Sequence, residues 1–204
     1  VAPLPSRWTL EEGAAAPLVY LTAWKALVFQ GGLRSGESVL VNGASGGVGV
    51  AAVQLAKSLG ARVVALSRGE DKRKRLVELG ADVALDSDAR DMEEQAKKAL
   101  AGGADIVIEN LGGPFVQKSV NVANPNGRIM VIGLLTGLVS EIVMGQVLFK
   151  QVRIEGVHVG KFSPDETRVA WKKVVETLDA SGRKPVLDRI FPMGGVQEAF
   201  ARLS

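Results

Sequence analysis

Short apolar runs alternate along the chain with longer segments in which apolar residues recur at helical spacing. The runs predict β-strands at residues 38–42, 63–67, 83–86, 105–109, 128–133 and 152–159, and residues 186–191 are a further strand candidate. Most of these runs are continuously apolar instead of alternating, which is typical of strands buried on both faces. This succession predicts a doubly wound α/β fold, with a parallel sheet of about six strands and helices on both faces.

Helices are predicted between the strands. The first covers residues 9–30, where Thr9 and Glu12 form a capping-box pattern and two glycines follow the last residue. Ser163 followed by Pro164 and two acidic residues predicts another helix start, for a helix that ends near residue 180. The remaining helices are expected at residues 48–59, 70–79 and 91–100, from residue 114 onward, and at 142–150.

The length of 204 residues, with 47% hydrophobic and 23% charged residues, suits one globular domain. The formal net charge of +3 is too small to indicate a nucleic-acid partner. With no Cys and one His, the sequence excludes disulfide scaffolds, thiol catalysis, zinc fingers and iron–sulfur clusters built from this chain alone. The sequence has no secretory signal pattern and no apolar stretch that could span a membrane, which predicts a cytoplasmic protein. The first residue is Val1 and the final pattern is helical, which indicates a chain cut at both ends.

A glycine-rich loop follows the first predicted strand and opens the next helix. Its sequence is NGASGGVG at residues 42–49, close to G-x-G-x-x-G but with Ala44 at the first glycine position. Small residues let the backbone turn tightly and approach a pyrophosphate, while the helix N-terminus offers free N–H groups and its positive dipole end. This strand–loop–helix context predicts a dinucleotide site of Rossmann type, formed by Gly43, Ser45, Gly46, Gly47, Val48 and Gly49.

The same loop also spells G-x-S-x-G around Ser45, which is the nucleophile-elbow pattern of a serine hydrolase. Asp105 or Glu109, followed by His158, would complete the chain order of a triad. The further glycines favour phosphate binding instead, and His158 is expected to be a structural residue within an apolar strand. A methyltransferase that binds S-adenosylmethionine would want an acid at position 67, where this sequence has Ser67.

The end of the second predicted strand indicates which dinucleotide is bound. Sites that prefer NAD place Asp or Glu there, and such an acid would repel a 2′-phosphate. This sequence has Ser67 and Arg68 there, with Lys72 one turn into the next helix, and these side chains suit a 2′-phosphate. The cofactor is therefore predicted to be NADP(H); the alternative is that Arg68 is a solvated loop residue. The basic run at 72–75 is expected to be a solvated helix face and not a nucleic-acid site, because no aromatic residues are interleaved with it.

The glycine loop belongs to a wider set of segments that occur together. They are LTAWKAL (21–27), GESVLVNGASGGVG (36–49), QLAKSLGARVVA (54–65), ELGAD (78–82), GRIMVIG (127–133) and RKPVLDRIFP (183–192). In combination they resemble the medium-chain dehydrogenase/reductase superfamily, and most closely its quinone oxidoreductase and zinc-independent alcohol dehydrogenase branch. Family members combine a GroES-like catalytic domain with a nucleotide-binding domain. The resemblance implies that residues 1–204 are the NADP-binding domain, with an N-terminal helical segment, and that the catalytic domain is missing from this chain.

The resemblance also implies roles for single residues beyond the glycine loop and the 2′-phosphate positions. Thr22 would lie near the nicotinamide, and Asn110, after the fourth strand, would line the adenosine side. The residues after the fifth strand would flank the nicotinamide end, and they are Gly133, Leu134 and Leu135. The loop at 159–161 would do the same after the sixth strand. That strand would be the edge through which two copies join into a homodimer.

The reaction that the resemblance implies is hydride transfer from NADPH to a small-molecule quinone, enone or carbonyl substrate. Leu18 stands where zinc-dependent relatives carry a Cys or an acidic zinc ligand, so a zinc-independent enzyme without a metal site is expected. The fragment alone is expected to bind NADPH and to turn over poorly or not at all. The alternative from another class is a non-catalytic nucleotide sensor that uses the same loop.

Overall fold

The computed structural model describes residues 4–203, and these form a single parallel sheet of six strands in the order β3-β2-β1-β4-β5-β6. The strands are β1 (Ser38–Val41), β2 (Arg62–Leu66), β3 (Val83–Leu85), β4 (Ala104–Glu109), β5 (Ala123–Val131) and β6 (Arg153–Gly156). The first strand, β1, lies in the middle of the sheet, β2 and β3 extend the sheet on one side of it, and β4 lies on its other side. This order confirms the predicted doubly wound fold, whose switch point lies between β1 and β4.

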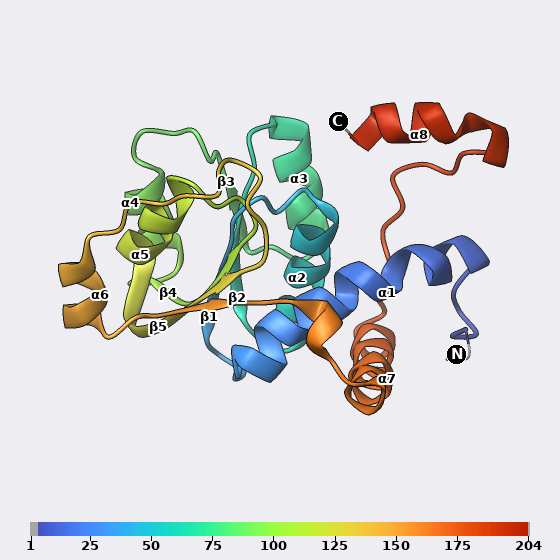
Figure 1. Ribbon diagram of the computed structural model, residues 1–204, viewed down its shortest axis with the longest axis horizontal. Helices are drawn as coiled ribbons and strands as arrows, with labels where there is room; N and C mark the ends of the chain where they lie inside the picture. Colours follow the sequence, from blue (N-terminus) through green and yellow to red (C-terminus); the bar gives the residue numbers. More distant parts are fainter. Residues whose placement is uncertain (1–3, 204) are drawn as a thin grey trace.

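Helices cover both faces of the sheet, as predicted (Figure 1). One face carries α1, α2, α3 and α7, and the other carries α4, α5 and α6. The helices are α1 (Leu10–Trp24), α2 (Gly47–Ser58), α3 (Glu70–Glu78), α4 (Met92–Ala99), α5 (Phe115–Val122), α6 (Met144–Lys150), α7 (Pro164–Ala180) and α8 (Val196–Leu203), with the short helices η1 (Lys25–Gln30), η2 (Val159–Lys161) and η3 (Met193–Gly195).

Each face of the sheet has its own apolar core, because successive strand residues point to opposite sides. In β1, Val39 and Val41 join the core under α1, α2 and α7, whereas Leu40 joins the core under α4 and α5. All three side chains are at most 1% exposed. Burying a side chain of this kind contributes about 1.5 to 3 kcal/mol. The double burial explains why the strands are continuously apolar in sequence.

The first predicted helix changes its hydrogen bonding partway along. The Thr9–Glu12 capping box is formed at its start, and α1 runs to Trp24. From Lys25 the chain continues as the π-helix η1, and its last turn closes with the N–H of Gly31 donating to Ala26 O at 3.0 Å. The predicted helix at 9–30 is therefore two segments, and turns of the π type occur frequently at functional sites.

The predicted strand at 128–133 starts earlier and ends earlier in the structure, because β5 covers Ala123–Val131. The strand includes an Asn-Pro-Asn-Gly segment at 124–127, a pattern typical of turns, which forms a bulge with Asn126 in the left-handed region at φ 61°. The ladder with β4 resumes after the bulge at the pair Ile106 and Arg128. Turn-forming residues occur both at the ends of strands and at bulges within a strand, so the sequence alone does not distinguish the two.

The strand candidate at 186–191 is wrong. These residues run as irregular chain past α1 and α2, away from either edge of the sheet, and lead to α8 (Figure 1). Gln54 in α2 holds the segment by donating its Nε2 to Lys184 O at 3.2 Å, and the Tyr20 hydroxyl donates to the same Gln54 side chain. An apolar run forms a strand only where another strand offers backbone groups, and none of the described strands lies beside this segment.

Candidate functional site

The glycine loop connects β1 to α2 at the carboxyl edge of the sheet, as predicted. Gly46 is the N-cap of α2 in extended conformation, and no side chain caps this helix. The first bond within the helix is donated by the N–H of Val50 to Gly46 O at 2.9 Å. The N–H groups of Gly47, Val48 and Gly49 therefore have no acceptor within the helix and are available to an anion.

The four glycines of the loop meet different steric limits. Gly43 has φ +62°, a conformation that other residues rarely adopt. A Cβ atom on Gly49 would lie 2.5 Å from Gly43 O, so only glycine lets the helix approach the loop this closely. A Cβ atom on Gly47 would lie 3.0 Å from Cγ1 of Val19, which shows that α1 lies against the loop. A Cβ atom on Gly46 would meet only Gly43 O, at 3.5 Å. Backbone thus limits the loop at Gly49, and the Val19 side chain limits it at Gly47.

Ser67 lies at the end of β2, beside the glycine loop. Its hydroxyl donates to Ser45 Oγ at 3.2 Å, so the structure brings these two predicted residues together. Arg68 and Lys72 follow as exposed side chains. Arg73, which sequence reasoning missed, holds this turn by donating to Ser67 O at 3.1 Å and to Arg68 O at 2.7 Å. The turn is thus fixed, while Arg68 and Lys72 are free to extend over it.

Glu109 at the end of β4 is a second residue that sequence reasoning missed in this role. Its carboxylate is completely buried and accepts hydrogen bonds from the backbone N–H groups of Leu111 (2.8 Å) and Gly112 (3.1 Å). It also accepts from the Ser119 hydroxyl at 2.6 Å and from the Asn42 side-chain amide. Four donors thus hold a buried acid where β1, β4 and α5 meet, directly behind the glycine loop. Charge-assisted bonds of this kind are about twice as strong as neutral ones.

Asn110 follows Glu109 and ties the same two strands. Its Nδ2 donates to Asn42 O at 2.7 Å, and its backbone leaves no space for a side chain at Gly133, where a Cβ atom would lie 2.4 Å from Asn110 O. The loops after β4 and β5 are further joined by the N–H of Thr136, which donates to Leu111 O at 2.7 Å. The structure therefore places Asn110 and Gly133 in contact at the carboxyl edge.

The remaining predicted residues lie at the margins of this edge. Leu134 and Leu135 continue from Gly133 and are 45% and 82% exposed. Thr22 is buried in α1, and its hydroxyl donates to Leu18 O at 2.7 Å within the helix. The Thr22 oxygen can still accept a hydrogen bond, but its own proton is already used.

His158 differs from the sequence expectation. The predicted strand at 152–159 ends at Gly156, so His158 lies in the following loop with an exposed side chain. The prediction that His158 lies in an apolar strand is therefore wrong. Ser45 is hydrogen bonded to Ser67, and the carboxylate of Glu109 is enclosed by its four donors. Neither arrangement is that of a Ser–His–acid triad.

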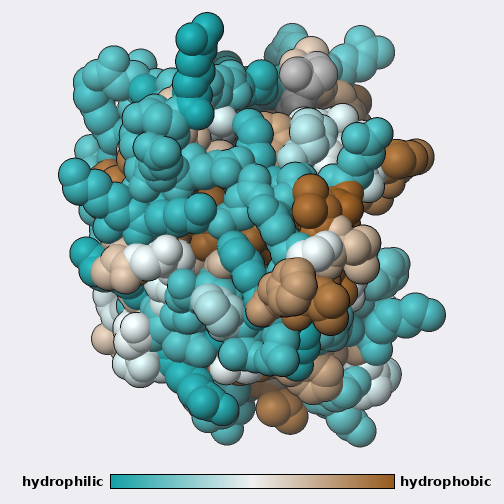
Figure 2. Space-filling view, turned by 90° about the vertical axis from the view of Figure 1, so that its left-hand side faces the viewer, coloured by the Kyte–Doolittle hydropathy of each residue, from teal (hydrophilic) through white to brown (hydrophobic). Residues whose placement is uncertain are grey.

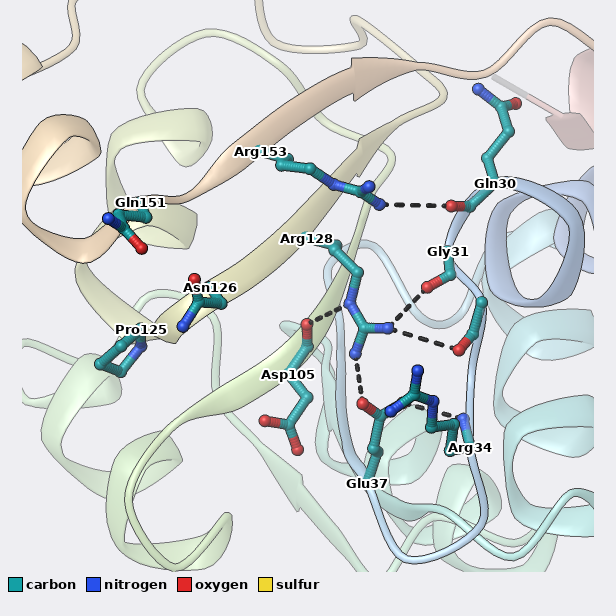
Figure 3. A pocket seen from close by; sticks show the side chains of 11 residues that line it. Gln30, Gly31, Arg34, Glu37, Asp105, Pro125, Asn126, Arg128, Gln151 and Arg153 are labelled. Atoms are coloured by element: carbon teal, nitrogen blue, oxygen red, sulfur yellow. Dashed lines mark hydrogen bonds and ion pairs between the residues drawn. The ribbon is translucent and has the colours of Figure 1, made fainter.

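A polar pocket of about 550 Å³ lies at the opposite, amino edge of the sheet (Figure 3). At its centre Arg128 pairs with Glu37 at 2.6 Å and donates to Gly31 O at 2.7 Å and Asp105 O at 3.2 Å. The guanidinium is thus saturated by the chain itself. This pocket shares no residue with the glycine loop, so it is not part of the candidate nucleotide site.

Residues 4–203, which the structure describes, contain neither a cluster of metal ligands nor a membrane-spanning helix. No group of three or more His, Cys, Asp or Glu side chains in this part of the chain could hold a metal ion. No helix in the same residues is long and apolar enough to cross a membrane.

Comparison with known proteins agrees with this geometry. Residues 47–179 match the family model described as zinc-binding dehydrogenase. The human quinone oxidoreductase is 30% identical over 197 residues, covering 96% of this chain and 59% of that protein. The spectinabilin polyketide synthase system protein NorB of Streptomyces orinoci is 41% identical over 133 residues, covering 65% of this chain and 6% of that protein. The structure of the mycobacterial protein Rv1454c complexed with NADPH matches with a TM-score of 0.79 and 25% identity, covering 88% of this chain and 56% of that one. The chain thus spans about three fifths or less of the relatives that it matches.

Proposed function

The chain belongs to the medium-chain dehydrogenase/reductase superfamily as a nucleotide-binding domain, and on that premise we propose that it binds NADPH for a reductase. The reductase transfers hydride to a small-molecule quinone, enone or carbonyl substrate. The observation that carries the proposal is that the glycine loop and the turn after β2 lie side by side, joined by the hydrogen bond from Ser67 to Ser45. That turn has a serine where NAD-preferring sites have an acid.

The turn after β2 supports NADPH over NADH. The exposed guanidinium of Arg68 offers donors to a 2′-phosphate, Ser67 brings no negative charge to the end of β2, and Arg73 keeps the turn in place from behind. The first acid after the turn, Glu70, is paired with Lys74 at 2.8 Å on the surface of α3. A dianionic phosphate therefore meets a serine and two free basic side chains, Arg68 and Lys72, at this position.

The chain's own residues position the cofactor. The free N–H groups of Gly47, Val48 and Gly49 hold the pyrophosphate at the positive end of α2, and Glu109 keeps the loop behind it rigid. The nicotinamide end lies across β4, β5 and β6, which form the second half of a doubly wound sheet. NADPH, when bound, supplies the hydride, and the protein contributes orientation and exclusion of water.

Further parts of the proposal concern the whole protein. A GroES-like catalytic domain outside this chain supplies most of the substrate pocket. The enzyme is zinc-independent, because Leu18 has a side chain that cannot bind a metal. Two copies pair through the open edge of β6. Near that edge, exposed apolar residues of α6 gather on an otherwise mostly hydrophilic face (Figure 2), among them Met144, Leu148 and Phe149.

The test is an assay of the full-length protein with NADPH and a panel of quinones, enones and carbonyl compounds. Oxidation of NADPH that depends on one of these acceptors supports the reductase. Tight NADPH binding without turnover on any acceptor favours the non-catalytic nucleotide sensor instead. The same assay after metal chelation tests zinc independence, for which unchanged turnover is expected.

A further inference from the structure

The π-helix η1 reaches across to β6 and to the loop that follows it. At one end, Gln30 donates its Nε2 to Glu155 Oε1 at 2.5 Å and to Gly156 O at 3.2 Å. At the other end, the ammonium of Lys25 donates to His158 O at 3.1 Å. One short irregular helix thus holds both the last residues of β6 and the loop beyond them.

Lys25 is an unusual residue for this task, because it is only 6% exposed. Its ammonium lies 4.3 Å from the centre of the Phe162 ring and 5.9 Å from that of Phe29, and the two rings pack edge to face. Its one hydrogen bond among the described residues is to the His158 carbonyl. The charge of Lys25 also lowers the pKa of Glu166, although hydrogen bonds with Ser163 lower it more.

A buried ammonium with so few partners costs stability, and an apolar side chain of similar length would pack at least as well. The charge of Lys25 adds a directed hydrogen bond and cation–π contacts, and these fix the position of the loop after β6. The loop is also tied to the sheet, because the N–H of Val157 donates to Val131 O at 2.8 Å. Lys25 therefore adds a directed polar contact to a loop that is otherwise held by the Val157 bond and by the apolar packing of Val159 and Phe162.

We propose that Lys25 is a positioning residue for the nicotinamide half of the site, acting through the loop Val157–Lys161. This inference rests on the proposed function, since the loop follows β6 at the carboxyl edge, in the half of the sheet beyond the switch point. The loop carries the exposed His158, the only His of the sequence. Lys25 touches neither pyrophosphate cradle nor 2′-phosphate turn, so its effect is confined to the nicotinamide end.

The experiment compares two ligands, NADPH and 2′-phospho-ADP-ribose, which lacks the nicotinamide. Their affinities are measured for the wild-type chain and for Lys25→Met, Lys25→Arg and a control, Lys98→Met, at an exposed lysine of α4. Lys25→Met is expected to weaken NADPH binding about 5- to 10-fold, as for loss of one charge-assisted bond, and to change 2′-phospho-ADP-ribose binding less than twofold. Lys25→Arg keeps the charge and is expected to show a smaller loss, again for NADPH alone. The control is expected to leave both affinities unchanged.

Equal losses for both ligands in Lys25→Met, or no loss for either, overturn the inference and leave the proposed function standing. A wild-type chain that binds neither ligand overturns the proposed function itself, and the inference with it. If Lys25→Met does not fold, as judged by circular dichroism, Lys25→Arg decides the matter. An arginine variant that folds and loses both ligands to the same extent contradicts the positioning role.

Discussion

At the amino edge of the sheet the central guanidinium is bound to a carboxylate and to backbone carbonyls, whereas at the carboxyl edge a row of backbone donors is left open. Arg128 at the amino edge is saturated by Glu37 and by backbone carbonyls. Gly47 to Gly49 at the carboxyl edge have N–H groups without acceptors in their helix. The pocket of about 550 Å³ is at the amino edge, and the candidate ligand site is at the carboxyl edge. Unused hydrogen-bonding capacity, and not concavity, therefore marks the candidate site in this fold.

The largest expected effect comes from closing the cradle. Gly49→Ala places a Cβ atom 2.5 Å from Gly43 O, so α2 must move away from β1. We expect a loss of roughly 2 to 4 kcal/mol in the free energy of unfolding, as for an overpacked site, and a loss of NADPH binding of at least 100-fold. Chemical denaturation and fluorescence titration measure the two quantities.

The matched control for this variant is Gly46→Ala. Its Cβ atom meets only Gly43 O at 3.5 Å, and its φ of −79° suits alanine. The free energy of unfolding should change by less than about 1 kcal/mol. If both alanine variants are equally stable, the close approach at Gly49 does not have the role given to it here.

The next prediction compares a variant at the carboxyl edge of the sheet with a variant at the amino edge. Glu109→Ala leaves four buried donors without their acceptor, so it should lower the free energy of unfolding by about 3 kcal/mol and also weaken NADPH binding more than tenfold. Arg128→Met breaks the ion pair with Glu37 and should cost about 2 kcal/mol in stability while NADPH affinity stays within twofold. Denaturation and titration of both variants give the comparison. NADPH binding that falls equally in the two would contradict the division between the edges.

A smaller effect is expected at the turn after β2. Arg68→Ala removes an exposed guanidinium and should weaken NADPH binding about 5- to 20-fold, while NADH affinity stays unchanged. Arg75→Ala, at another exposed basic residue of α3, serves as the control. Equal effects of Arg68→Ala on both cofactors would mean that Arg68 is a solvated loop residue.

The smallest effect concerns acid stability at the amino edge. Burial raises the pKa of Asp105, but donors from Ser38 and Asn124 and the charge of Arg128 outweigh it, and the pKa is below its usual value. A carboxyl group with a lowered pKa in the folded state stabilises the fold above its unfolded pKa of about 3.9, and this stabilisation is lost as the pH falls further. Asp105→Asn should therefore reduce the slope of stability against pH below about pH 4, with little change in NADPH affinity at neutral pH. Thermal melting over that pH range measures the slope, and an unchanged slope would show that Asp105 does not contribute to acid stability.

The sequence predicted those features that depend on neighbouring residues. The capping box at Thr9, the helix start at Ser163, the glycine loop after β1 and the serine at the end of β2 all follow from local spacing, and the structure places them as expected. The order of apolar runs and helices was also enough for the doubly wound fold, because strands buried on both faces leave a continuous signal.

The parts that the sequence did not predict depend on residues far apart in the chain. Glu109 is one acid at the end of a strand, and only the folded chain brings Asn42 and Ser119 to it. Lys25 lies in an ordinary helical pattern, and its partner carbonyl comes more than a hundred residues later. The same limit explains the wrong strand at 186–191, since a strand is defined by its neighbour and not by its own composition.

Calorimetric titration of the chain with NADPH and with NADH tests the central claim most directly. The open donors of the glycine loop and the turn at Ser67 and Arg68 predict that NADPH binds and that NADH binds at least about tenfold more weakly. No measurable NADPH affinity, or tighter binding of NADH, would contradict the account.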